Sequence, residues 1–264
     1  NVIDRFAFAS NTTATDWGNS IDARSNNPAG QSSSTDGFTS GGYNAVNTID
    51  KFSFTSNAGS ADYADLSVGR YAVTGQSSST HGFTCGGNVS GDTIDKFSFS
   101  STATAVDHGN LSSSKTNCTG QSSTDYGFNS GGSGYTDTID KFAWSSNTTA
   151  SDHGNLSLSR RGNSGQSSSD YGFMAGGYDG SRSSVIDKFA FASNTTASDH
   201  GDLITAMHSQ SGQSSTTDGY ASGGNTAGDS PVNTIEKFSF TSNTTAADHG
   251  DLSVSRRQTA GHQY

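Results

Sequence analysis

Charged residues, proline and cysteine are scarce in this chain, and long apolar runs are missing from it. Charged residues make up 14% and hydrophobic residues 29% of 264 positions, with two prolines and two cysteines. No stretch approaches the roughly 18 apolar residues of a membrane span, so we expect no membrane insertion. Two cysteines, Cys85 and Cys118, are too few for a disulfide framework or a metal site, and we expect free thiols.

Basic residues are also too few for nucleic acid binding. The chain has 14 Lys and Arg against 24 Asp and Glu, a formal net charge of -10. Affinity for a phosphate backbone depends on clustered Lys and Arg that release counterions, so nucleic acid is excluded as a partner. The low hydrophobic content also argues against one deep core. Disordered chains share that low content, but they lack regularly spaced aromatic residues.

Regular spacing of aromatic residues is what this chain does have. A five-residue motif occurs six times and consists of an acidic residue, a basic residue, Phe, a small residue and an aromatic residue. Its copies start at residues 4, 50, 95, 140, 187 and 236, at intervals of 46, 45, 45, 47 and 49. A fixed period in this range is typical of a propeller or a solenoid array. The period therefore determines the expected fold class.

Each period contains four short strand-like pieces separated by turn residues. In the copy that begins near Thr74, strand A covers residues 74–79, strand B residues 81–85, strand C residues 93–99, and strand D surrounds residues 107–111. Four short strands per unit are typical of a propeller blade, and no window has a sustained helical period. We therefore predict an all-β, six-bladed β-propeller of four-stranded antiparallel blades, with helix nearly absent.

The sixth blade is expected to be divided between the two ends of the chain. Residues 1–264 form one domain in this interpretation, and the ring closes when N-terminal strands C and D join a C-terminal strand A. From Glu236 to the end and on to Asp4 there are 32 residues, about thirteen fewer than the period of 45. Strand B of this blade is therefore predicted to be absent or supplied in another way. The chain begins with Asn1, as expected of a processed product, an excised domain or a partial sequence.

The repeat resembles the kelch repeat. Strand B ends in paired glycines, strand C has an aromatic residue, and a ring-bearing residue is followed three residues later by Leu in five of six copies. The glycine pairs start at Gly41, Gly86, Gly131, Gly176 and Gly223, and the ring position is occupied by Trp17, Tyr63, His108, His153, His200 and His249. Only the first copy has the Trp of the family, so the resemblance is to a divergent member and implies a propeller fold. The Ser/Gly-rich segments, such as Gly-Gln-Ser-Ser, also resemble repeat proteins encoded by tailed phages of marine cyanobacteria. This second resemblance implies a virion appendage, hence an extracellular or virion-associated location.

Groups that recur in every blade are predicted to be architectural. Equivalent histidines on different blades radiate apart, whereas zinc ligands must converge on one ion, so we expect packing and no metal. Neighbouring Asp50 and Lys51 in a strand point to opposite faces and cannot act together as acid and base. The Asp is expected to accept hydrogen bonds from the backbone or from a neighbouring blade, and the Lys stem to cover apolar surface. The inner-strand glutamines, from Gln31 to Gln213, are expected to line a polar central channel that could hold a small ligand.

Other recurring motifs carry no catalytic signal. The four Asn-Thr-Thr triplets match the glycosylation motif, but we interpret them as strand C to strand D turns. No motif specifies a nucleophile with a base and an orienting group, so the prediction is a protein that is not an enzyme and has no cofactor.

Differences between copies indicate where recognition is expected. Between the glycine pair and the acidic residue of strand C lie 7, 7, 7, 9 and 11 residues, so length variation is concentrated in the B-to-C loops. These loops share one face of the disc with the D-to-A connections, and variable loops on a rigid scaffold are common recognition sites. The candidate binding residues are Tyr43, Tyr135, Tyr178, Asp179 and Arg182 from the B-to-C loops, and Arg24, Arg70 and Arg160 from near the D-to-A connections.

The function predicted from the sequence is a non-enzymatic binding or structural module. Its partner would be a protein or a glycan on a host or virion surface, contacted through the B-to-C/D-to-A loop face. Two alternatives stay open. A carbohydrate-binding lectin would have repeated sugar pockets between blades, and an enzyme would have one asymmetric cleft lined by acids or bases that the repeat does not share.

Overall fold

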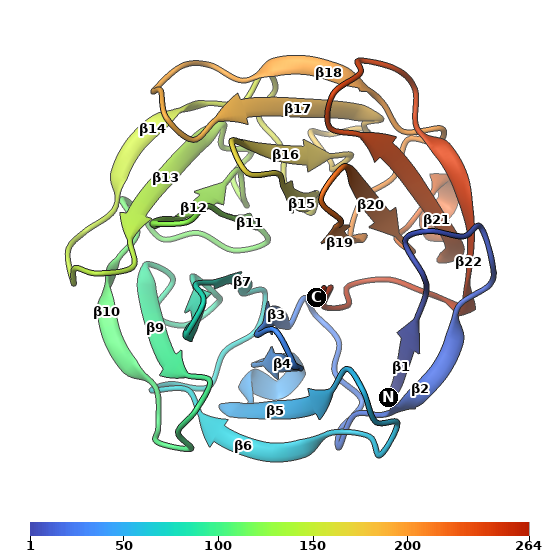
Figure 1. Ribbon diagram of the computed structural model, residues 1–264. Coiled ribbons are helices and arrows are strands. Elements are labelled where there is room, and N and C mark those ends of the chain that lie inside the picture. The colour runs from blue at the N-terminus through green and yellow to red at the C-terminus, as the bar shows by residue number, and fades with distance from the viewer. Residues whose placement is uncertain (264) are drawn as a thin grey trace.

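The computed structural model describes residues 1–263 and shows blades arranged in a ring around an axis (Figure 1). Five blades are complete, and each is an antiparallel sheet whose strands A, B, C and D follow one another from the axis outward. None of the helices in the described part of the chain is long and apolar enough to cross a membrane.

The strand bounds follow the sequence repeat closely. Blade 1 contains β3 (Ala29–Ser32), β4 (Asp36–Ser40), β5 (Thr48–Ser53) and β6 (Ala61–Asp65). Blade 2 contains β7 (Thr74–Ser77), β8 (His81–Cys85), β9 (Thr93–Ser98) and β10 (Val106–Asn110). Blade 3 contains β11 (Thr119–Ser122), β12 (Tyr126–Ser130), β13 (Thr138–Ala143) and β14 (Ser151–Asn155). Blade 4 contains β15 (Ser164–Ser167), β16 (Tyr171–Ala175), β17 (Val185–Ala190) and β18 (Ser198–Asp202). Blade 5 contains β19 (Ser211–Ser214), β20 (Asp218–Ser222), β21 (Val232–Ser239) and β22 (Ala247–Arg256).

The prediction of six four-stranded blades was wrong. The remaining sheet has two strands, β1 (Val2–Arg5) and β2 (Thr15–Asn19), which occupy the strand C and strand D positions. Residues 259–263 run to the centre of the ring between β19 and β3, but they form no strand. The five complete blades are therefore joined by a two-stranded sheet and a C-terminal segment, because no stretch of residues 1–263 forms a further strand B.

Helix is limited to two short 3-10 turns in the described residues, as predicted. These are η1 (Tyr43–Ala45) and η2 (Ala227–Asp229), and both lie in B-to-C loops. The paired glycines that precede these loops adopt a backbone conformation that other residues rarely use. Gly41 has φ 68° and Gly42 φ 126°, and the amide of Gly42 donates to the carbonyl of Arg70. The turn therefore requires glycine.

The core consists of thin layers between neighbouring blades. One layer contains Phe83, Ile94 and Leu111 of blade 2 with Phe142 and Trp144 of blade 3. In this layer the rings of Phe83 and Trp144 are stacked with their centroids 4.5 Å apart. Cys85 and Cys118 are buried free thiols, as predicted.

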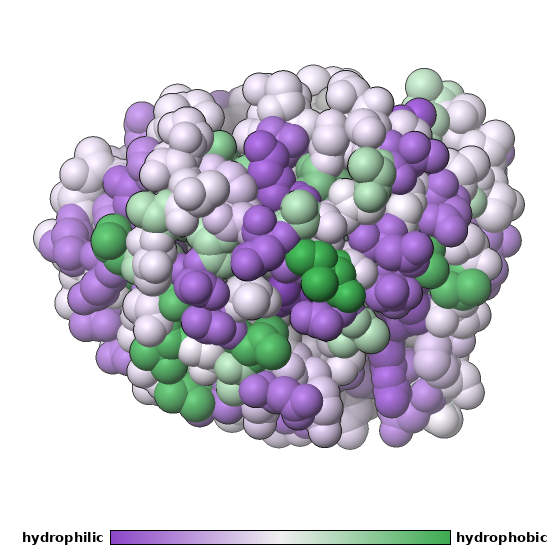
Figure 2. Space-filling view, turned by 90° about the horizontal axis from the view of Figure 1, so that it is seen from below, coloured by the Kyte–Doolittle hydropathy of each residue, from purple (hydrophilic) through white to green (hydrophobic). Residues whose placement is uncertain are grey.

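Most of the aromatic residues lie inside these layers. On the side of the disc that Figure 2 shows, apolar residues form only small separate groups among more polar ones. Stability therefore comes from repeated contacts between blades.

Candidate functional site

The loop face is built from the B-to-C loops and the D-to-A connections, as the sequence predicts. Its most individual part lies over blades 3, 4 and 5, where the two longest B-to-C loops meet. Six side chains gather there, and we call them the loop-face cluster: Tyr135, Arg161, Tyr178, Arg182, His208 and Asp229.

Tyrosine and arginine side chains alternate along one side of the cluster. The Arg161 guanidinium lies 5.3 Å from the ring centroid of Tyr135 and 5.7 Å from that of Tyr178. The two tyrosine rings are 6.3 Å apart, and the ring of Tyr178 is 5.6 Å from that of His208. Arg161 and Tyr178 also exchange two backbone hydrogen bonds, of 3.1 and 2.8 Å, which fix their positions. The arrangement offers flat rings and cations to a partner, and Tyr135 is 40% exposed.

Charged groups form the other side of the cluster. The Arg182 guanidinium pairs with the Asp229 carboxylate, and His208 Nε2 lies 3.7 Å from the same carboxylate oxygen. Loss of surrounding water lowers the pKa of His208, and the nearby Arg182 charge lowers it further. His208 is therefore neutral at pH 7 and can donate or accept a hydrogen bond. His208 was not among the residues predicted from the sequence, because its position, next to Met207 in a D-to-A connection, shows no repeated pattern.

The other predicted B-to-C residues lie near the cluster or apart from it. Asp179 follows Tyr178 and accepts a hydrogen bond of 2.9 Å from the amide of Ser181, which lowers its pKa. This bond closes a turn within the loop. Tyr43 is 56% exposed in η1 of blade 1, two blades away from Tyr135. The structure therefore brings together Tyr135, Tyr178 and Arg182 of the predicted set, and leaves Tyr43 separate.

The three predicted arginines from the D-to-A connections are not available on the surface. Arg70 and Arg160 are fully buried, and the Arg24 side chain is 4% exposed. Each guanidinium reaches strand C of the next blade and pairs with its aspartate, at 2.8 Å for Arg24–Asp50 and at 3.0 Å for Arg70–Asp95 and Arg160–Asp187. Burial removes these arginines from the candidate surface. Their recurrence at one repeat position is the sequence signal that they are architectural.

The repeated ring position, for which packing was predicted, also links neighbouring blades. Trp17, Tyr63 and His153 each donate a hydrogen bond to a strand C carbonyl of the next blade, at 2.9, 3.1 and 2.9 Å. The acceptors are Ser53, Ser98 and Ala190 in turn, and His108, His200 and His249 make the same contact. The position requires a flat ring with a polar edge because the ring packs on aromatic neighbours while its edge satisfies a buried carbonyl.

The inner-strand glutamines do not line a channel, so this prediction was wrong. Gln31, Gln76 and Gln121 are 1 to 2% exposed, and their amides donate to the carbonyls of Phe83, Phe128 and Phe173 in the following blade. The axis instead has a cavity of about 100 Å³ lined by glycine, asparagine, serine and threonine residues at the starts of the inner strands. These amides therefore link each inner strand to strand B of the following blade.

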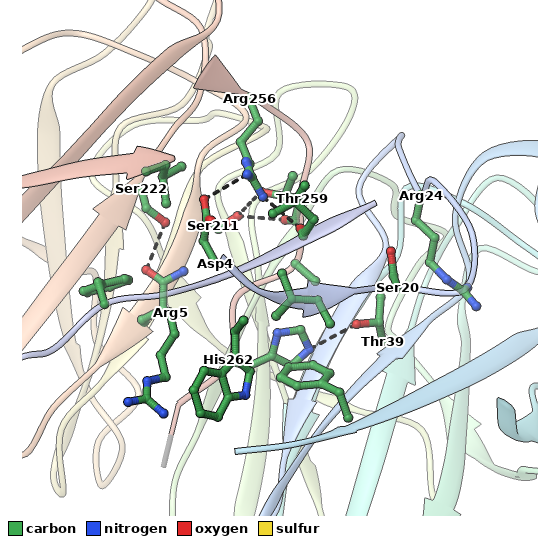
Figure 3. Close-up of a pocket in the computed structure, with 18 of the residues that line it drawn as sticks. Asp4, Arg5, Ser20, Arg24, Thr39, Ser211, Ser222, Arg256, Thr259 and His262 are labelled. Carbon is green, nitrogen blue, oxygen red and sulfur yellow. Dashed lines mark hydrogen bonds and ion pairs between the residues drawn. The ribbon is translucent and has the colours of Figure 1, made fainter. Parts of the chain in front are cut away.

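We call the place where the two ends of the chain meet the seam of the ring. It contains a larger cavity of about 640 Å³ (Figure 3). It lies between β1, the C-terminal segment and blade 1, and its walls include Ile3, Phe6, Trp17, Phe52 and Gln213. Of the acids and bases around it, Asp4 and His262 already have partners, whereas Arg5 lies against the ring of Trp17. Asp4 pairs with Arg256, and His262 Nε2 donates to the carbonyl of Phe38 at 2.7 Å. Burial lowers the pKa of His262 to about 4, so the imidazole is neutral at pH 7.

Comparison with known proteins identifies the fold. No family model matches the chain, and no curated protein matches its sequence. The solved structure of YjhT is similar, with a TM-score of 0.76 and 12% sequence identity over 93% of this chain and 89% of that chain. At this identity the likeness shows the fold alone, and one fold serves many functions. The chain is a β-propeller with four-stranded antiparallel blades.

Proposed function

We propose that this protein is a non-enzymatic binding module whose loop-face cluster contacts a protein or a glycan on a surface. The β-propeller fold is compatible with a binding or structural role. The observation that carries the proposal is the alternation of Tyr135, Arg161, Tyr178 and His208 on the loops that differ most between blades.

The chemistry of the cluster suits such a partner. Tyrosine rings stack on sugar faces and on apolar side chains, and their hydroxyl groups add hydrogen bonds. Arg161 and Arg182 supply cations on a chain with a net charge of -10, so the cluster is a local site for acidic or hydroxyl-rich groups. Elsewhere in residues 1–263 tyrosine rings and cations meet in smaller groups, such as Tyr126 with Lys141 and Tyr171 with Lys188.

We also propose a biological setting for this binding module. The Ser/Gly-rich repeats resemble repeat proteins of tailed phages, and this supports a virion appendage that contacts a host surface or another structural protein. An extracellular or virion-associated location goes with it.

The test compares two pairs of substitutions on opposite faces of the disc. Tyr178→Ala with Arg182→Ala removes a ring and a cation from the cluster. Tyr171→Ala with Lys188→Ala removes a similar pair at the start of strand B, where the Lys188 ammonium lies 4.0 Å from the Tyr171 ring centroid. Labelled protein is applied to a glycan array and to bacterial envelope fractions. We expect at least about tenfold weaker binding for the first pair only.

The same measurements separate the alternatives. Equal binding by both paired variants and the unaltered protein would remove the loop face from consideration. Several equivalent sugar sites per chain would favour the lectin with repeated pockets, and turnover of a bound glycan would favour the enzyme.

A further inference from the structure

The inner edge of β1 has no strand beside it. In each of the five complete blades strand C pairs with strand B on one side and strand D on the other, whereas β1 pairs with β2 alone. Residues 259–263 occupy the inner-strand position of this sheet, since Gln263 donates to Ser32 and accepts from the amide of Ser214. The seam cavity therefore lies where strand B stands in the other blades (Figures 1 and 3).

Apolar side chains of β1 and of the residue that follows it are left partly open to this cavity. Ile3 is half-buried, although the isoleucine at the same position is fully buried in every complete blade, as Ile49, Ile94, Ile139, Ile186 and Ile235. Phe6 is also half-buried, although its five counterparts are at most 7% exposed. The cavity is thus an apolar slot beside an open strand edge.

A polar group at the slot also lacks its usual partner. The amide of Gln166 donates to the carbonyl of Tyr220, the strand B aromatic residue of the next blade, at 2.9 Å. Gln213 is the equivalent residue facing the seam, and its Nε2 donates to no carbonyl among residues 1–263, while its Oε1 accepts from Ser222. A strand in the slot would bring a carbonyl to this amide.

We propose that the seam cavity is a strand-binding site that takes one extended polypeptide segment from outside residues 1–264, antiparallel to β1. The segment has the pattern acidic residue, Gly, aromatic residue, any residue, small residue. Addition of a strand to an open sheet edge combines backbone hydrogen bonds with side-chain pockets, and both are present here.

The glycine in the pattern is inferred from strand B of the five complete blades. A Cβ added to Gly37 would lie 2.3 Å from Cζ of Phe52, and the other four blades have the same contact at 2.3 to 2.4 Å. In the seam Phe6 takes the place of Phe52. Only glycine leaves room for that ring.

The aromatic residue and the small residue follow in the same way. Phe38 is fully buried, with its ring 5.1 Å from Tyr63 and 5.5 Å from Phe97. The seam counterparts of these two rings are Trp17 and Phe52, and both line the cavity. The residue two positions after the aromatic one is Ser, Cys or Ala in all five blades and is at most 3% exposed.

Charge specifies the first residue of the segment. Asp36 and Asp218 begin strand B in two blades, and each pairs with the strand C lysine opposite, Lys51 or Lys237, at 3.2 Å. Arg5 takes the lysine position in β1 and is exposed, with its guanidinium 3.8 Å from the ring centroid of Trp17. An acidic residue in the segment would pair with Arg5.

Peptide binding tests the proposal directly. The probe is a synthetic copy of residues 34–42, Ser-Thr-Asp-Gly-Phe-Thr-Ser-Gly-Gly, with blocked ends. Trp17 lines the cavity, so its fluorescence reports binding once the second tryptophan, Trp144, is replaced by Phe. We expect saturable binding to monomeric protein, slower hydrogen exchange in β1, and at least about tenfold weaker binding for peptides with Gly37→Val or Phe38→Ala.

A charge swap identifies the site and the direction of the strand. Arg5→Glu should weaken binding of the Asp-containing peptide, and a peptide with Asp36→Lys should recover it, because Arg5 is exposed and its replacement leaves the fold intact. No binding at millimolar peptide, equal binding of the Gly37→Val peptide, or no recovery in the charge swap would overturn the proposal. Self-association that the peptide displaces would also overturn it, because the occupant would then be a second copy of the chain.

Discussion

Arg256 Nη2 lies 2.8 Å from Asp4 Oδ2, and this ion pair joins the last strand of the ring to the first. The amide of Ser253 donates to the same carboxylate at 3.0 Å, and Arg256 Nη1 donates to the carbonyl of Val2. The contact repeats the Arg70–Asp95 and Arg160–Asp187 pairs. The ring is therefore closed by the same type of Arg–Asp ion pair that joins neighbouring blades.

We expect Arg256→Met to lower the free energy of unfolding by about 2 kcal/mol, between the values for exposed and buried pairs. Methionine is a conservative replacement, because Met207 occupies this repeat position in another blade. Lys51→Met is the control, since the Lys51–Asp36 pair is more exposed and should cost less than about 1 kcal/mol. Urea denaturation measures both.

Adding Asp4→Asn to Arg256→Met should restore part of the loss, because the carboxylate would no longer be left without its cation. Equal costs for Arg256→Met and Lys51→Met would show that the seam pair does not hold the ring closed.

Close approach of the inner strands makes their glycines sensitive to substitution. A Cβ added to Gly75 would lie 2.2 Å from the carbonyl oxygen of Gly30 in the preceding blade. Gly75→Ala should lower the free energy of unfolding by about 3 kcal/mol, because backbone atoms must move. Differential scanning calorimetry would record the loss as a lower Tm.

Gly134→Ala is the matched control for backbone strain. Gly134 has φ 89° with no neighbouring atom within 4 Å of the added Cβ, so the cost should be only about 1 to 2 kcal/mol. A smaller loss for Gly75→Ala than for Gly134→Ala would contradict the packing argument.

His262 should make the seam sensitive to acid. Burial lowers its pKa to about 4, whereas in the unfolded chain it is about 6.5. Between these values the unfolded state binds the proton and the folded state does not, so the free energy of unfolding falls as the pH drops from 6.5 to 4.

His262→Gln should remove this dependence at little cost. Glutamine at the equivalent positions, such as Gln31 and Gln76, makes the same contact to a strand B carbonyl at 3.0 Å. We expect denaturant unfolding to give similar stability for variant and unaltered protein at pH 7.5 and a more stable variant at pH 5. The other histidines with lowered pKa are present in both proteins and cancel, namely His81, His108, His153, His200 and His208. If the free energies of unfolding of the two proteins changed in parallel with pH, His262 would not be the group responsible.

Local patterns were enough to predict the blade but not the closure of the ring. The alternation in residues 93–99 and the glycine pair at Gly86 predicted strands B and C correctly, because side-chain direction along a strand follows from sequence position alone. The shortfall of about thirteen residues was visible at the seam, yet the expectation of six blades was wrong. Counting repeats does not show whether a partial repeat completes a sheet.

The candidate site was only partly predictable for a similar reason. Loop length directed attention to Tyr178 and Arg182, but Arg160 and Arg161 are adjacent and identical in type. Arg160 is buried in an ion pair, while Arg161 lies against two tyrosine rings. Which of the two lies on the loop face depends on the direction of the chain where it enters the next blade.

The repeating blade, the residues that fill the layers between blades, and the face on which the loops differ could all be predicted from the sequence, because each depends on periodicity within about 45 residues. The three-dimensional structure was needed to show that five blades are complete, that the arginines of the connections are buried, and that β1 borders an open slot. These features depend on contacts between residues far apart in the chain, such as Asp4 with Arg256 and Phe38 with His262.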